Sequence, residues 1–279
     1  MNGNPCPPGG NPKCFAQHLG ECEGEIEKEH PVSECVLLAV SGGKSTIFVR
    51  GRPSQKEGEV REIPIPNIVS HVLCAKHNRA LTDFDAAGGK FAEGMEAMNA
   101  LLGDTKASFD TFEVDGDALE RWMLKVLYGA VFGGDTKLPD NAKSKGILPP
   151  IEGLRILYKG ESFPPGQGLY LLPGPPGANA TDELELGREP LMSADGNIAG
   201  MRFVFYGFNF VLLVANVHPD HASKLDDWMY RPKGITIRGC NKLLRFKWKT
   251  GAYSDTHLVT WEGLFDLEGN RIPREEKRG

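Results

Sequence analysis

Two segments of the chain place apolar residues at the spacing of an α-helix. In the stronger one they recur every three or four positions at Leu119, Trp122, Met123, Val126, Leu127, Ala130 and Val131. Asp117 and Glu120 resemble a capping box at its start, and Gly133-Gly134 predicts its end. A weaker pattern is carried by Phe84, Phe91, Met95, Met98 and Leu102, with Gly88 and Gly89 weakening its start. We expect both helices to form hydrophobic core.

Other apolar runs alternate or lie between turn residues, as in β-strands. Val36–Val40 and Thr46–Arg50 flank Ser41-Gly42-Gly43, which predicts a β-hairpin, and Val60 to Leu73 predicts short extended pieces. Six further strands are expected at Arg155–Tyr158, Gly168–Leu172, Gly200–Tyr206, Phe208–Asn216, Ile235–Arg238 and Leu243–Lys249. Asp195-Gly196-Asn197 is typical of a hairpin turn.

These patterns predict an α+β protein divided into four parts. Residues 1–13 form a flexible lead-in, residues 14–86 a Cys- and His-rich module, residues 87–147 a helical segment, and residues 148–279 a mostly antiparallel β-rich region. A boundary is expected near residues 140 to 150, although the helices could also pack onto the sheet in one core.

Composition adds little to this picture. The chain has 279 residues, 40% of them hydrophobic and 25% charged, as in ordinary globular proteins. No run reaches the roughly 20 apolar residues that a membrane span needs, and the Gly- and Pro-rich start lacks the apolar segment of a signal peptide. We therefore expect a cytoplasmic protein without a membrane partner. A net charge of −5 disfavours a non-specific nucleic-acid coat protein but not a nuclease with a local basic patch.

The cysteines change the picture, because four of the six lie within the first 35 residues. Seven residues separate Cys14 from Cys22, and Cys74 and His77 form a C-x-x-H pair. Structural zinc needs four such ligands, usually brought as two pairs. We predict that these four residues hold Zn²⁺. His18 or Cys6 could replace one of them, and Cys35 and Cys240 are interpreted as buried small hydrophobic residues.

The order of the remaining polar residues reveals a family resemblance. Glu29-His30 lies between the two ligand pairs, Asn67 precedes the second pair, and Asn78 follows it. This order resembles the zinc-bearing HNH, or ββα-metal, endonucleases, over about a quarter of the chain. The wider first Cys pair, His77 in place of a second Cys, and Asn78 in place of the last His depart from the family pattern. In an alternative register, His77 is a catalytic metal ligand, and His18 or Cys6 completes the zinc site.

The resemblance implies a division of roles. His30 would be the general base that takes a proton from the attacking water, as a neutral imidazole can near pH 7. Glu29 and Asn78 would hold a catalytic Mg²⁺ or Mn²⁺ ion through oxygen atoms, and Asn67 would orient His30 by a hydrogen bond.

A second candidate site lies near the C-terminus. Seven basic and no acidic residues occur between Arg231 and Lys249, and a strand there would align Arg245, Lys247 and Lys249 on one face. Either this face, with Arg238 and Lys242, contacts nucleic-acid phosphates, or it is a solvated edge strand guarded by lysines.

The sequence thus predicts an HNH-like endonuclease that hydrolyses phosphodiester bonds in nucleic acid, with DNA as the first candidate. One rival is a zinc-stabilised protein that binds nucleic acid or a partner without catalysis. Another is a β-domain that binds a small molecule or partner and uses zinc only for stability.

Overall fold

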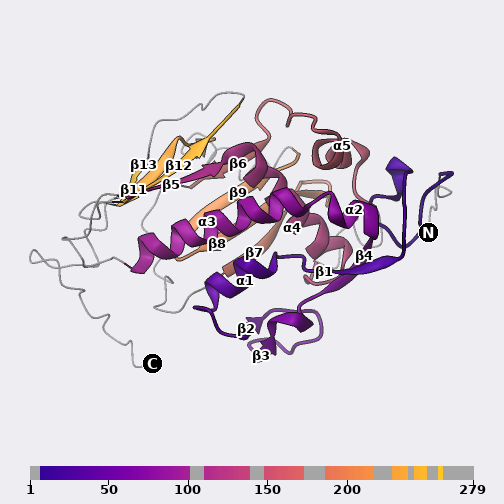
Figure 1. The fold of residues 1–279 in the computed structure, drawn as a ribbon, viewed down its shortest axis with the longest axis horizontal. Coiled ribbons are helices and arrows are strands. Elements are labelled where there is room, and N and C mark those ends of the chain that lie inside the picture. Colours follow the sequence, from indigo (N-terminus) through magenta and orange to yellow (C-terminus); the bar gives the residue numbers. More distant parts are fainter. Residues whose placement is uncertain are drawn as a thin grey trace, which may run out of the picture.

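A computed structural model of the chain describes residues 7–100, 110–138, 148–172, 186–215, 228–237, 242–249 and 257–259. Within these ranges the fold is α+β, with five α-helices and mostly antiparallel sheets (Figure 1). In this part of the chain, no helix combines the length and apolar character needed to cross a membrane.

The N-terminal module is built on a strand–strand–helix unit. Strand β1 (Ile26–Glu29) pairs antiparallel with β4 (Ser70–Cys74), and helix α2 (Ala75–Arg79) follows β4 directly. The register places Ile26 opposite Cys74 and Glu29 opposite Ser70. The two strands are far apart in sequence, so the residues at their ends come together only through this pairing.

The segment between β1 and β4 differs from the expected hairpin. Glu34–Val40 forms helix α1, so the predicted strand at Val36–Val40 is wrong. Its apolar residues Val36, Leu37 and Val40 share one buried helix face, and their run was too short to separate from a strand pattern. The predicted strand at Thr46–Arg50 is present as β2, and its partner is β3 (Val60–Pro64). A 3₁₀ turn, η2 (Ile65–Asn67), leads from β3 to β4.

Both predicted helices are present, as α3 (Thr82–Ala100) and α4 (Gly116–Phe132). Gly88 lies within α3 and not at its start. A Cβ at this position would lie 2.5 Å from the indole of Trp122, so the glycine allows α3 and α4 to pack closely. The capping box is wrong: Asp115 caps α4 by accepting a 2.9 Å hydrogen bond from the Ala118 N–H. Glu120 is instead buried, with its carboxylate paired to the Arg231 guanidinium at 2.8 Å.

The C-terminal region begins with a helix and continues as two sheets. Helix α5 (Ile151–Lys159) replaces the strand predicted at Arg155–Tyr158. Pro150 and Gly160 bound about two and a half helical turns, with buried Leu154 and Leu157 on one side. The first sheet has the order β10-β6-β9-β8-β7 and is antiparallel. Its strands are β10 (Met229–Tyr230), β6 (Gly168–Leu171), β9 (Phe208–Leu213), β8 (Ile198–Phe205) and β7 (Leu186–Met192). The predicted turn at Asp195-Gly196-Asn197 joins β7 to β8.

The second sheet joins strands from both sides of the boundary expected near residues 140 to 150. Its order is β13-β11-β12-β5, with β13 (His257–Val259), β11 (Gly234–Ile237), β12 (Lys242–Lys247) and β5 (Asp110–Asp115). Strand β5 comes from between α3 and α4, yet it pairs with β12. Phe91 on α3 stacks edge-on against Phe205 and Phe210 of the other sheet, with ring centroids 4.9 and 5.1 Å away. One hydrophobic cluster therefore extends from Cys14 to Phe246, across the helical and β-rich segments.

Candidate metal centre and the His30 site

The structure brings Cys14, Cys22, Cys74 and His77 into one group that could hold a metal ion. Their ligand atoms all lie within 4.8 Å of one another. Cys14, Cys74 and His77 are buried and Cys22 is half-buried, so the group is shielded from bulk water on most sides. These are the four residues that the sequence predicts as ligands: the pair Cys14 and Cys22, and the pair Cys74 and His77.

The distances fit a tetrahedral ion of the size of zinc. The Nδ1 atom of His77 lies 3.5, 3.7 and 3.2 Å from the sulfur atoms of Cys14, Cys22 and Cys74. With Zn–S near 2.3 Å and Zn–N near 2.0–2.1 Å, a tetrahedral site requires about 3.6 Å between sulfur and nitrogen. The donor set of three thiols and one imidazole is one that structural zinc uses.

The wide spacing of Cys14 and Cys22 has a local cause. A 3₁₀ turn, η1 (Gln17–Leu19), fills the interval, and Gly20 and Glu21 with positive φ then turn the chain back. Gly24 (φ +74°) continues the path toward β1, and a Cβ there would lie 2.8 Å from the Cβ of Ala75. The glycine allows the first ligand loop to approach α2, which carries His77.

Burial acts on the protonation of the thiols. It raises the pKa of Cys14 to about 12 and also raises the pKa of Cys22. Burial also acts to raise the pKa of Cys74, but hydrogen bonds from the backbone of His77 and Glu23 outweigh it, and the net shift is downward. Desolvation lowers the pKa of His77, so its imidazole is neutral near pH 7. A bound cation would stabilise the thiolates that burial disfavours.

The other Cys and His residues lie elsewhere. His18 is half-buried in η1 and is not part of the group of four. Cys35 is exposed, so its interpretation as a buried residue is wrong; its sulfur lies 3.5 Å from the Asp85 carbonyl. Cys6 and Cys240 lie outside the described residues.

His30 follows β1 directly and is held in a defined orientation. Its Nδ1 lies 2.8 Å from the backbone carbonyl oxygen of Ile68. A carbonyl oxygen only accepts, so Nδ1 carries the proton and Nε2 of the neutral ring has a free lone pair. The residue is half-buried, on the border between core and solvent. Asn67, which was expected to orient His30, is exposed. His30 instead donates its hydrogen bond to the backbone carbonyl of the next residue, Ile68.

Glu29 points away from solvent into an ion-pair network. Its carboxylate pairs with the Nζ of Lys125 on α4, which also contacts Asp85 Oδ1 at 2.5 Å. Ser33 donates a hydrogen bond to Asp85 and accepts one of 2.8 Å from the Trp122 indole. Burial raises the pKa of Glu29, and the nearby Lys125 ammonium opposes the shift. We call these residues, Glu29, Ser33, Asp85, Trp122 and Lys125, the Lys125 network.

Asn78 lies beside a different acid. Its Nδ2 donates a 3.1 Å hydrogen bond to Glu27 Oε2, and both side chains are half-buried. Glu27 is two residues before Glu29, with a β-bulge between them. The sequence placed Glu29 with Asn78, whereas the structure places Glu27 there. The string Glu27-Lys28-Glu29 contains both acids, and only the bulge and the buried lysine separate their roles.

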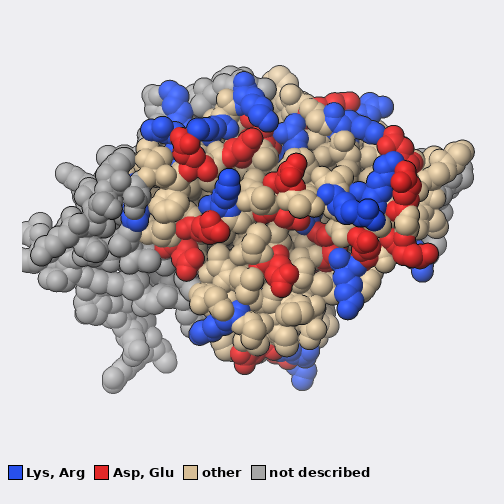
Figure 2. Space-filling model, viewed as in Figure 1, with Lys and Arg blue, Asp and Glu red and all other residues tan. Residues whose placement is uncertain are grey.

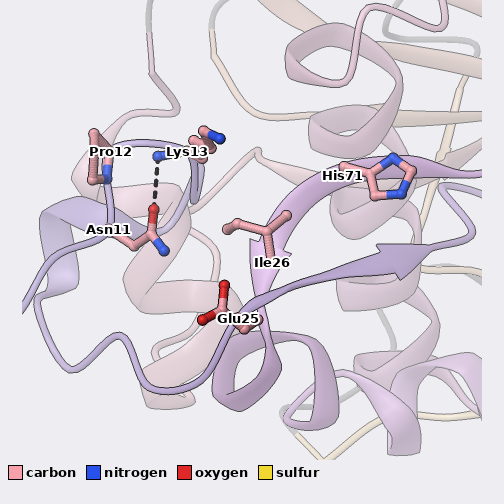
Figure 3. A pocket seen from close by; sticks show the side chains of 6 residues that line it. All are labelled: Asn11, Pro12, Lys13, Glu25, Ile26 and His71. Atoms are coloured by element: carbon pink, nitrogen blue, oxygen red, sulfur yellow. Dashed lines mark hydrogen bonds between the residues drawn. The ribbon is translucent and has the colours of Figure 1, made fainter.

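An open pocket lies beside the start of β1 and β4 (Figure 3). It has a volume of about 480 Å³ and is lined by Asn11, Pro12, Lys13, Glu25, Ile26 and His71. Lys13 directly precedes Cys14 in the sequence, and Ile26 is paired with Cys74 across the sheet. His71, which had no assigned role in the sequence, projects from β4 and is exposed.

The basic strand near the C-terminus is largely neutralised. Lys247 lies 2.5 Å from Glu113 of β5, Arg245 3.7 Å from the same carboxylate, and Lys249 3.6 Å from Asp115. Lys242 is buried over the Phe112 ring, and Arg238 lies outside the described residues. On the face shown in Figure 2, basic and acidic side chains are likewise interspersed. The parallel neighbour that supplies the acids could not be identified from the strand alone.

Comparison with known proteins adds no relative. No family model matches the chain, and no match was found among curated proteins or solved structures.

Proposed function

We propose that this chain is a metal-dependent endonuclease of the HNH kind, which hydrolyses phosphodiester bonds in nucleic acid, DNA being the first candidate. The observation that carries the proposal is the hydrogen bond between His30 Nδ1 and the Ile68 carbonyl. It leaves Nε2 as the free base at the end of a strand that pairs with β4 and is followed by α2. This strand–strand–helix order is the one that the resemblance implies.

The chemistry assigned to His30 is general base catalysis. Its Nε2 would take the proton of the attacking water, and the Ile68 carbonyl would stabilise the imidazolium that results. Because the hydrogen bond fixes the ring, the base needs no reorientation before reaction.

A divalent ion such as Mg²⁺ would be held by the oxygen atoms of Asn78 and Glu27. These two side chains already lie side by side, and carboxylate and amide oxygens suit a hard cation. When bound, the ion would stabilise the negative charge that develops at the phosphate and at the leaving oxygen. The sequence predicts Glu29 as this ligand, but the structure pairs its carboxylate with Lys125.

Zinc at Cys14, Cys22, Cys74 and His77 would have a structural role. Four protein ligands fill a tetrahedral ion and leave no position for water or substrate. The ion would tie the first ligand loop to the β4–α2 junction and so hold β1 in register.

A second candidate function is that of a zinc-stabilised protein that binds nucleic acid or a partner without catalysis. The engagement of Glu29 with Lys125 favours it, because the acid adjacent to the catalytic His of the family would then be unavailable to a metal.

Cleavage assays separate the two functions. Purified protein is incubated with supercoiled plasmid, single-stranded DNA and RNA, with Mg²⁺, Mn²⁺ or EDTA. The matched variants are His30→Ala and His71→Ala, since His71 is an exposed histidine on the neighbouring strand. We expect metal-dependent cleavage that falls at least a hundredfold in His30→Ala and is unchanged in His71→Ala. Cleavage that persists in His30→Ala, or no cleavage by wild type with any metal, would contradict catalysis.

The ligand assignment has its own test. Glu27→Gln should raise the Mg²⁺ concentration that gives half-maximal cleavage, because it removes a charged oxygen ligand. Glu29→Gln should leave that concentration unchanged and lower thermal stability. A raised half-maximal Mg²⁺ concentration in Glu29→Gln but not in Glu27→Gln would identify Glu29 as the ligand.

A further inference from the structure

We propose that Arg52 and Arg188 form a phosphate-binding site at the C-terminal end of α4, which takes the sugar–phosphate backbone of nucleic acid. The inference rests on the proposed function for its choice of ligand. The residues themselves come from three distant parts of the chain: the loop after β2, the end of α4, and β7.

The site is organised around a buried acid. Asp135, just beyond α4, has a side chain only 6% exposed. Arg52 Nη2 lies 2.6 Å from its Oδ1, and Arg188 Nη2 lies 2.9 Å from its Oδ2. Arg188 is held by a hydrogen bond to Asp135 Oδ2, and Arg52 by its ion pair with the same carboxylate, so both groups are placed before any ligand arrives.

The charge of this cluster is unbalanced. Two guanidinium groups face one carboxylate, which leaves a net charge of +1, and the arginine side chains remain 24% and 19% exposed. The Nη1 of Arg188 is buried and has no hydrogen-bond partner among the described residues. A buried donor without a partner costs free energy, and the exposed parts of the two guanidinium groups are the donors that a phosphate oxygen would contact. Arginine pairs suit phosphate because their planar donors bind two oxygens at once.

The cluster lies at the same end of the β1–β4 pair as His30. The last turns of α4 pack against this end: a Cβ on Gly129 would lie 3.1 Å from Pro31, and one on Gly133 would lie 3.1 Å from Ser70. Ser70 faces Glu29 across the sheet. Asp135 folds back on the helix, where its N–H donates a 2.9 Å hydrogen bond to the Ala130 carbonyl. A nucleic-acid strand that reaches His30 would therefore pass the end of α4.

This cluster differs from the basic strand β12. There, Glu113 and Asp115 pair with Arg245, Lys247 and Lys249 at the surface. Exposed pairs of this kind add little to binding, whereas guanidinium groups held in place lose less entropy when they bind phosphate.

Binding without cleavage tests the site. The full chain is titrated against a fluorescein-labelled oligonucleotide in EDTA, at several KCl concentrations, by fluorescence anisotropy. Arg188→Gln and Arg52→Gln should each raise the Kd about tenfold and reduce the salt slope by about one. Arg61→Gln is the matched control, because Arg61 on β3 forms an exposed ion pair with Glu59. It should leave both quantities unchanged. Addition of inorganic phosphate should weaken oligonucleotide binding to wild type more than binding to Arg188→Gln.

A conservative variant distinguishes loss of binding from loss of folding. Arg188→Lys keeps the charge and the ion pair with Asp135, and should keep most of the salt slope while losing part of the affinity. Wild-type affinity in Arg188→Gln and Arg52→Gln, or no binding by wild type, would overturn the inference. Cleavage by wild type that is insensitive to His30→Ala would refute the proposed catalysis but leave this binding result intact.

Discussion

The β1–β4 pair is held at its two ends by opposite kinds of chemistry. At the α2 end, three cysteines and one histidine surround a point that a metal ion would fill. At the His30 end, the Lys125 network joins β1, α1, α3 and α4 through a buried ammonium and two carboxylates. The first end uses residues within one module, and the second recruits α4. The proposed active site is thus stabilised by the rest of the protein as well as by its own motif.

The largest effect is expected at the metal end. Cys74→Ser removes a buried ligand, and structural zinc contributes on the order of 10 kcal/mol to folding of small metal-dependent modules. Loss of the β1–β4 pairing should follow, seen as faster amide hydrogen exchange across β1 and β4. Cys35→Ser is the control, because Cys35 is exposed and outside the group. Equal protection in the two variants would show that the metal end does not hold the strands.

The Lys125 network should respond next. Lys125 is 2% exposed, and removing one partner of a buried ion pair costs about 3–5 kcal/mol. Lys125→Met should therefore lower the free energy of unfolding by about that amount in urea denaturation while leaving the metal ligands in place. A loss within experimental error of zero would mean that the network does not stabilise the His30 end.

The pH dependence of that variant sharpens the comparison. Burial raises the pKa of Glu29 above its ordinary value, and without the ammonium the shift is larger. A carboxyl with a raised folded pKa favours the native state below its unfolded pKa, and this contribution is lost as the pH rises through the folded pKa. The difference in unfolding free energy between Lys125→Met and wild type should shrink on acidification from pH 7 toward pH 4. A difference that stays constant or grows would contradict the assignment.

Ser33→Ala should have a smaller effect. It removes the hydroxyl that joins the Trp122 indole to Asp85, and we expect a loss of about 2 kcal/mol in thermal or urea unfolding. The near-ultraviolet circular dichroism of Trp122 should change as well. An unchanged free energy of unfolding would remove Ser33 from the network.

The smallest effect is expected at the basic strand. Lys247→Gln removes an exposed partner of Glu113, and neither the unfolding midpoint nor oligonucleotide affinity should change measurably. A clear loss of affinity would restore β12 as the phosphate-contacting face.

These two ends also show what the sequence could predict. Cys14, Cys22, Cys74 and His77 could be paired from their residue types and spacing, because metal ligands form a small set with recognisable intervals. The helices α3 and α4 followed from their apolar period. By contrast, α1 has only seven residues, and α5 only nine, so their patterns could be taken for strands.

Contacts between residues far apart in the chain could not be predicted from the sequence. Nothing about Lys125 in an apolar helix predicts that it pairs with Glu29, 96 positions earlier. Similarly, Glu27 and Glu29 could not be distinguished, because a β-bulge decides which one lies beside Asn78. Arg52 and Arg188 are unremarkable in sequence and become related only through Asp135.

The metal content of the purified protein tests the central claim most directly. Elemental analysis should give one zinc per chain for wild type, Cys35→Ser and Lys125→Met, and close to none for Cys74→Ser. A mercurial reagent that titrates the thiols of wild type should release the same amount of zinc to a chelating dye, whether or not Cys74→Ser folds. Zinc-free wild type after purification and zinc addition, or full zinc content in Cys74→Ser, would contradict the metal-stapled module on which the proposed nuclease depends.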